Sequence, residues 1–106
     1  MTKGYWIATV TVTDAEQYQR YQVLARDVLT QYGAKPIVRS DDIHVMESRD
    51  GKNAERCVIL EFTSLESALK CYHSAAYQEA REARRNAAVV DITIVSGLEN
   101  SSTHNP

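Results

Sequence analysis

Two-residue hydrophobic periodicity marks the predicted strands. Along residues 5–12, apolar and small side chains on one side alternate with Tyr, Ile and Thr on the other, so that neither side carries a charge. Residues 57–62 form a nearly continuous apolar run, which is typical of a central strand with both faces covered. The other expected strands are 35–39, 43–47 and 91–97, of which the first two form either a hairpin or one long strand with a bulge.

Three- to four-residue periodicity marks two helices. The first begins at a capping box in which Thr13 or Asp14 is the N-cap and a glutamate reaches back. Gly33 ends this helix, because glycine readily adopts the left-handed conformation of a C-terminal cap. The second helix follows another capping box at 63–66 and extends, with one interruption, to about Ala87.

The order of these elements is strand, helix, strand or hairpin, strand, helix, strand. With right-handed crossovers, it predicts an α+β ferredoxin-like βαββαβ fold, a four-stranded antiparallel sheet with both helices on one face. The other face must be covered by something else, and a second copy packed sheet on sheet is the simplest partner. We therefore expect a homodimer that forms a dimeric α/β barrel. The single domain is predicted over residues 1–98, with a disordered polar tail over 99–106.

Composition narrows the class of protein. The chain of 106 residues has a formal net charge of -2 with interspersed signs, which argues against a nucleic-acid partner and an anionic membrane surface. The N-terminus leads directly into a strand without an apolar signal core, so we expect a cytoplasmic protein. Cys57 and Cys71 are expected to be buried, reduced thiols. The histidines are scattered without a ligand pattern, so neither a metal nor a cofactor is expected.

A polar and aromatic cluster at residues 71–78 is the segment most typical of a site. The hydroxyl of Ser74 can accept a hydrogen bond from a backbone N–H two or three residues later, which would start a fresh helix at Ala75. His73 would then lie at the break and project sideways into a cleft, as a candidate acid or base near neutral pH. The structural alternative is that this run serves only capping and packing.

With this order of elements, the chain resembles, over roughly residues 4–98, the bacterial family of domain of unknown function 1330, DUF1330, in the dimeric α/β-barrel superfamily. The residues that carry the resemblance are Gly4-Tyr5-Trp6, Asp14, Tyr18, Tyr21, Tyr32-Gly33, Val38-Arg39, Ile59 to Phe62, Tyr72-His73-Ser74, Tyr77-Gln78, Arg84, and Val95 with Gly97. The resemblance implies the ferredoxin-like fold and a face-to-face dimer. It implies no established activity.

The chain departs from the family pattern at three places. Ala75 replaces a usual proline, Ala34 replaces the second glycine of a usual pair, and Ser96 replaces a usual glutamate. A proline at position 75 would suit the first helical position, so the helix break is expected to be softer here.

By analogy with the wider superfamily, a ligand would bind in a cleft between the helices and the sheet. The residues expected in this cleft are Tyr18, Tyr21, Arg39, Tyr72, His73, Tyr77 and Arg84. Tyrosines supply apolar walls with hydroxyl tips, and Arg39 or Arg84 could hold an anionic group. The alternative for the tyrosines is plain core packing, and the alternative for the arginines is an exposed edge or helix surface.

Two hypotheses of different class follow. In the first, the chain is a small enzyme or ligand binder that acts on a small organic molecule by cofactor-independent acid/base chemistry, with His73 moving a proton. In the second, it is a non-catalytic dimeric structural or interaction module whose cleft is filled by its own tyrosines. An open, polar-lined cavity would favour the first hypothesis, and a closed cleft the second.

Overall fold

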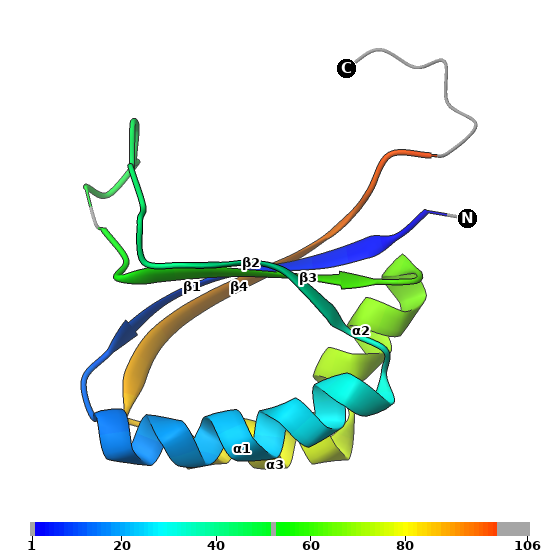
Figure 1. Ribbon diagram of the computed structural model, residues 1–106, viewed down its shortest axis with the longest axis horizontal. Helices are drawn as coiled ribbons and strands as arrows, with labels where there is room; N and C mark the ends of the chain where they lie inside the picture. The colour runs from blue at the N-terminus through cyan, green and yellow to red at the C-terminus, as the bar shows by residue number, and fades with distance from the viewer. Residues whose placement is uncertain (1, 52, 100–106) are drawn as a thin grey trace.

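The computed structural model describes residues 2–51 and 53–99. Within these residues, the elements are β1 (Gly4–Val12), α1 (Ala15–Gln31), β2 (Lys35–Ser40), β3 (Arg56–Phe62), α2 (Leu65–His73), α3 (Ala75–Ala83) and β4 (Ala88–Ser96). The strands form an antiparallel sheet in the order β2-β3-β1-β4. All the helices lie on one face of it (Figure 1). The predicted ferredoxin-like fold is confirmed, with β1 and β3 at the centre.

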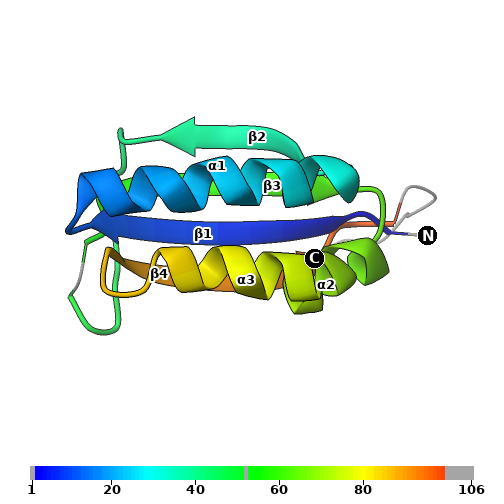
Figure 2. The ribbon, with the colours of Figure 1, turned by 90° about the horizontal axis from the view of Figure 1, so that it is seen from below.

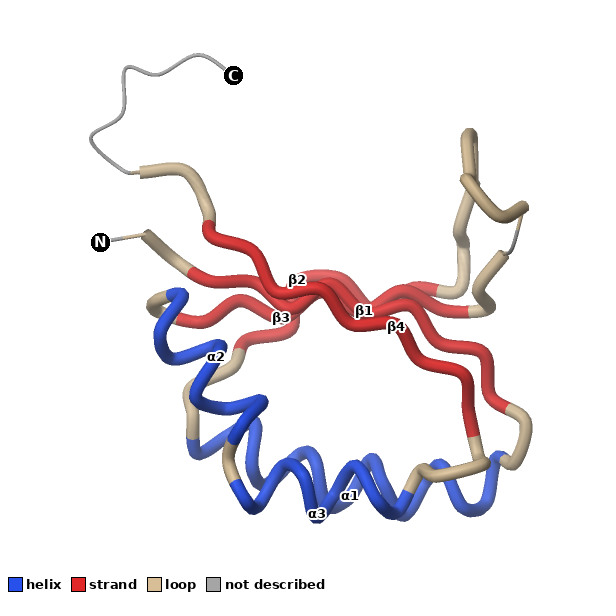
Figure 3. The backbone as a smooth tube through the Cα atoms, turned by 180° about the vertical axis from the view of Figure 1, so that it is seen from behind, coloured by secondary structure: helices blue, strands red, loops and turns tan. Residues whose placement is uncertain are grey.

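The helices form a single layer that runs along the sheet. Figure 2 shows α1 over the β2 and β3 side, while α2 and α3 lie over the β4 side. Seen from behind, the opposite face of the sheet is not covered by any described helix (Figure 3). We call this opposite side the outer face.

The predicted alternation along β1 separates the two faces. Trp6 and Val10 point to the helices and are buried, whereas Ile7 between them is 37% exposed on the outer face. On β3, Leu60 and Phe62 are buried on the helix side in the same way. The core therefore lies between the sheet and the helices, and it includes a tilted ring contact of 5.4 Å between Trp6 and Phe62.

The helix ends follow local side-chain chemistry. Asp14 is the N-cap of α1 and accepts a hydrogen bond of 3.1 Å from the N–H of Gln17, which settles the two alternatives in its favour. Gly33 has φ of +74° and ends α1 as predicted. Ser64 is the N-cap of α2 and accepts from the N–H of Ser67 at 3.0 Å.

The glutamates predicted to complete the two capping boxes make other contacts. Glu16 pairs with Arg20 at 3.9 Å, and Glu66 pairs with Lys70 at 2.8 Å, each one turn along its own helix. Ion pairs at this spacing are favourable on exposed helix surfaces, so they compete with a reach back to the cap.

The predicted helix break at Ser74 is confirmed. Its hydroxyl accepts a hydrogen bond from the N–H of Tyr77 at 3.1 Å and donates one to the carbonyl of Cys71 at 2.7 Å. Ser74 thus ends α2 and begins α3. This junction allows the helical layer to change direction under the sheet (Figure 1).

Three predicted boundaries are wrong. Residues 43–47 are not a strand but part of a mostly exposed connection, and the outer edge of β2 stays unpaired among the described residues. The last helix ends at Ala83 instead of Ala87, and the last strand begins at Ala88 instead of 91. Asn86, at φ of +64°, turns the chain between them.

The expectation for the two cysteines has a mixed outcome. Cys57 and Cys71 are both free, but only Cys71 is buried, whereas Cys57 is partly exposed. Of the predicted tail, residues 100–106 lie outside the described residues. Among the helices that the structure describes, none is long and apolar enough to cross a membrane.

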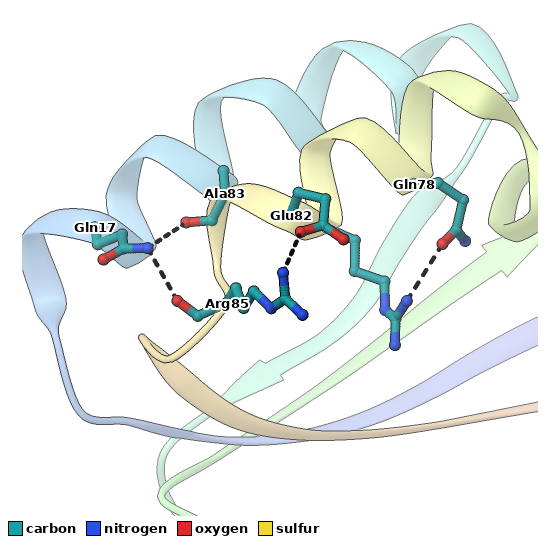
Figure 4. Close-up of polar contacts among 6 residues, drawn as sticks. Gln17, Gln78, Glu82, Ala83 and Arg85 are labelled. Atoms are coloured by element: carbon teal, nitrogen blue, oxygen red, sulfur yellow. Dashed lines mark hydrogen bonds and ion pairs between the residues drawn. The ribbon is translucent and has the colours of Figure 1, made fainter.

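The first turn of α1 is tied to the end of α3. The side-chain amide of Gln17 donates to the carbonyls of Ala83 at 3.1 Å and Arg85 at 3.0 Å (Figure 4). The backbone N–H groups of Thr13 and Asp14 both donate to the carbonyl of Ala87, at 2.8 and 3.0 Å. These bonds fix where α1 enters the helical layer.

Candidate functional site

A cavity of about 450 Å³ lies between α1 and the helix-facing side of the sheet. We call it the α1 cavity. Its volume falls within the range of small-molecule sites, which is roughly 300–1,000 Å³. Its floor consists of inward-facing residues of the three strands β1, β3 and β4, namely Trp6, Ala8, Val10, Val58, Leu60, Val90 and Ile92. This floor is apolar throughout.

The wall formed by α1 is more polar. Tyr18, Tyr21 and Gln22 come from successive positions on one side of the helix, followed by Ala25 and Arg26. Each aromatic ring therefore covers part of the cavity, while its hydroxyl supplies a hydrogen-bonding tip. The two tyrosine rings contact each other at 5.3 Å between centroids.

Tyr21 is linked to a residue behind the cavity. Its hydroxyl lies 2.7 Å from the hydroxyl of Tyr77 on α3, and either oxygen can be the donor. Tyr77 is fully buried, and its ring packs edge-on to Trp6 at 5.0 Å. When Tyr77 donates to Tyr21, the proton of Tyr21 is free for a second partner.

The hydroxyls of the two lining tyrosines stay protonated at neutral pH. Burial raises the pKa of Tyr21 far above its ordinary value, and the neighbouring Tyr77 raises it further. Burial also raises the pKa of Tyr18, although the positive charges of Arg56 and Arg84 partly oppose the shift. Both groups are therefore hydrogen-bond donors and not bases.

Three arginines complete the lining. Arg26 comes from α1, Arg39 from β2 and Arg56 from the start of β3. Within residues 2–51 and 53–99, the cavity lining includes no aspartate or glutamate. The electrostatic character of the cavity edge is therefore positive.

A family comparison adds to this geometry. The model of the family "Domain of unknown function (DUF1330)" matches residues 3–98. The chain belongs to this family. No match was found among curated proteins.

Solved structures share the DUF1330 chain's fold at low identity. One is RPA0582, a protein of unknown function from Rhodopseudomonas palustris, with a TM-score of 0.73 and 17% identity, covering 92% of this chain and 84% of the other. Another is SnoaB, a cofactor-independent oxygenase from Streptomyces nogalater, with a TM-score of 0.63 and 9% identity, covering 94% and 97%. At these identities the likeness establishes the fold alone.

The residues expected in the cleft of this DUF1330 chain divide into two groups. Tyr18, Tyr21 and Arg39 line the α1 cavity. Tyr72 and Tyr77 instead belong to the aromatic core around Trp6, at 5.8 and 5.0 Å between ring centroids, and they do not line the cavity.

Arg84 and His73 also lie outside the lining. The guanidinium of Arg84 lies over the ring of Tyr21, 5.2 Å from its centroid, and its buried Nε has no hydrogen-bond partner among the described residues. His73 is exposed at the end of α2, with its ring against Tyr72. His73 does not line the α1 cavity, because it follows Tyr72 by one residue and so turns away from the core.

Sequence reasoning missed Arg26 and Arg56 as lining residues. The signal for Arg56 is its two-residue spacing from Val58 and Leu60, which places all three on the same side of β3. The spacing of Arg26 from Gln22 places it on the cavity side of α1. No group of three or more His, Cys, Asp or Glu side chains that could hold a metal ion occurs in the described part of the chain.

Proposed function

We propose that this DUF1330 protein binds a small organic ligand in the α1 cavity. The observation that carries the proposal is the cavity itself, about 450 Å³ with an apolar floor and a wall of tyrosine and arginine side chains. Apolar surface supplies affinity, and a few convergent polar groups fix orientation. The alternative of a module with a closed cleft has less support, because Tyr18 and Tyr21 border this space without filling it.

The chemistry we propose is cofactor-independent and depends on donated hydrogen bonds. Tyr21 stays protonated and can direct its O–H into the cavity while Tyr77 donates to it from behind. A fixed donor in a partly desolvated site stabilises negative charge that develops on a ligand oxygen. SnoaB provides a precedent for cofactor-independent chemistry on this fold. His73 receives no step in this proposal, because it lies outside the lining.

A cavity-filling variant tests the proposal. Ala8 lies on the floor in β1, so Ala8→Phe places a ring into the space where the ligand would bind. A set of neutral and acidic bicyclic aromatic compounds is titrated by thermal shift against the native protein and this variant. We expect compounds that stabilise the native protein to lose their effect on Ala8→Phe, because ligand stabilisation requires binding to the folded state.

The matched control is Val23→Phe, which adds a similar ring to the exposed side of α1, where Val23 is 59% exposed. It should respond to the compounds as the native protein does. If Ala8→Phe does not fold, Gln22→Phe fills the same space from the helix. Undiminished stabilisation of a folded cavity-filling variant would refute the cavity as the binding site.

We also propose that the protein is a homodimer through the outer face. At its centre this face carries uncharged side chains, including Ile7 and Thr9 on β1 and Ile59 on β3, while the charged Glu61 and Asp91 also lie on it. The exposed hydrophobic residues Ile7 and Val95 lie on this face, and no described helix covers them. Pairing two such faces would bury this surface.

A further inference from the structure

The arginines of the α1 cavity have no acidic partner among the described residues, unlike two of the arginines elsewhere in the chain. Arg20 pairs with Glu16 at 3.9 Å along α1, and Arg85, which follows the end of α3, pairs with Glu82 at 3.5 Å. Arg26, Arg39 and Arg56 form no ion pair with any described residue. The cavity therefore concentrates positive charge in a chain whose formal net charge is -2.

Arg39 and Arg56 lie close together on adjacent strands. Arg39 is opposite Val58 in the β2–β3 register, and Arg56 precedes Val58 by two residues on the same side of β3. The two arginines are thus diagonal neighbours, and at this spacing long side chains can reach each other or a shared partner. Like charges at neighbouring positions repel, and an anion between the two guanidinium groups would relieve this repulsion.

The position of Arg56 relative to α1 is consistent with an anion between the two arginines. Its positive charge acts on the hydroxyl of Tyr18, which belongs to the opposite wall of the cavity. Arg56 is also only partly exposed, and it lines the cavity. An anion held there would be in reach of both the strand arginines and the α1 wall.

We infer that the ligand of the α1 cavity is a small organic carboxylate with an apolar ring body, whose carboxylate binds Arg39 and Arg56. This inference rests on the proposed function. A guanidinium matches the two oxygens of a carboxylate and forms charge-assisted hydrogen bonds with them. The floor, which includes Ala8, Val58 and Ile92, offers an apolar surface for the ring. A free phosphate would leave this floor uncovered.

Calorimetric titration with 2-naphthoate and its uncharged analogue 2-naphthamide tests the inference. The two probes have nearly the same shape and differ in charge. We expect the native protein to bind naphthoate at least about tenfold more tightly than naphthamide, the difference expected for one charge-assisted hydrogen bond or more. Arg39→Gln and Arg56→Gln should each remove most of this preference without changing naphthamide binding.

Arg20→Gln is the matched control, because it makes the same change in net charge on the exposed side of α1. It should retain the preference, which separates a direct contact from the field of the whole protein. Circular dichroism confirms that the variants fold, and if either single variant does not, Arg39→Met or Arg56→Met, which also removes the positive charge, is tested in its place with the same expected loss of preference.

The outcomes separate the inference from the proposed function. Equal binding of both probes would overturn the carboxylate inference and leave a neutral ligand site intact. Failure of both probes to bind would count against the inference and, if the compound set also fails, against the proposed function. Inorganic phosphate that binds as tightly as naphthoate would overturn the requirement for an apolar ring body.

Discussion

The hydrogen bond between Tyr21 and Tyr77 connects the cavity to the core, and it makes a prediction at the scale of single residues. Tyr21→Phe removes the 2.7 Å partner of a hydroxyl on a fully buried ring. We expect the free energy of unfolding to fall by about 1–2 kcal/mol, because a buried polar group is left without this bond. The midpoint of urea unfolding measures the change.

The double variant Tyr21→Phe/Tyr77→Phe provides the control for this pair. Removing both hydroxyls leaves no orphaned partner, so its loss of stability should be smaller than the sum of the two single losses. Strictly additive losses would show that the two hydroxyls do not depend on each other.

His73 gives a second prediction at this scale. The side chain is exposed and lies outside the α1 cavity. We therefore expect His73→Ala to shift the urea midpoint only slightly, by about 0.5 kcal/mol or less in stability, and to leave ligand binding unchanged. A loss of ligand binding in this variant would contradict the assignment of the site to the α1 cavity.

Single residues of the site were predictable from the sequence only where periodicity fixed their direction. Tyr18 and Tyr21 share a helix stripe with Ala25, so their inward direction follows from the pattern. His73 is a candidate by its chemistry and its place at a helix break, where a rotation of one residue decides whether a side chain faces the core or the solvent. Arg56 precedes an apolar run, and its two-residue spacing from Val58 is the only sequence signal that it faces the cavity.

At the scale of elements, the close approach of β1 to the start of α2 makes a prediction. A Cβ at Gly4 would lie 2.7 Å from the Cα of Leu65 and from the carbonyl oxygen of Ser64, both of which are backbone atoms. We expect Gly4→Ala to destabilise the fold by about 1–3 kcal/mol, because the strand and helix must move apart. Thermal unfolding measures the loss.

Gly97→Ala is the comparison variant. There a Cβ would meet the ring edge of Tyr5 at 2.7 Å, and this ring belongs to a side chain that can move. The loss of stability should be clearly smaller than for Gly4→Ala. A larger loss at position 97 would mean that the contact of β1 with α2 tolerates more strain than we infer.

The existence of the elements followed from local patterns, whereas some boundaries did not. The Ser74 junction and the Gly33 end each depend on a few neighbouring residues, and both were predictable. Residues 43–47 have a strand-like composition, but they do not pair with the free edge of β2. The turn after α3 is held at the Ala87 carbonyl, which accepts bonds from Thr13 and Asp14, residues far away in the sequence.

At the scale of the whole molecule, the outer face predicts the state of assembly. We expect a dimer at micromolar concentration in light scattering, and we expect Ile7→Lys to make the protein monomeric because it places a charge at the centre of that face. The control Val23→Lys places the same charge on the exposed side of α1 and should remain dimeric. A native monomer would refute the proposed interface.

The cavity is also a property of the whole molecule. Its volume depends on how far α1 stands from the sheet, and that position is set by bonds at the start of α1, such as those from Gln17 to Ala83 and Arg85 (Figure 4). No local pattern encodes such a distance. The sequence could therefore predict a cleft between helices and sheet but not which helix borders it.

The most direct test of the central claim is the mapping of amide chemical shifts in isotope-labelled protein as 2-naphthoate is added. The account predicts that the largest shifts occur along α1 and at the cavity-facing positions of β1 and β3, including the side chain of Trp6. Shifts confined to the outer face, or to the α2–α3 junction around His73, would contradict it.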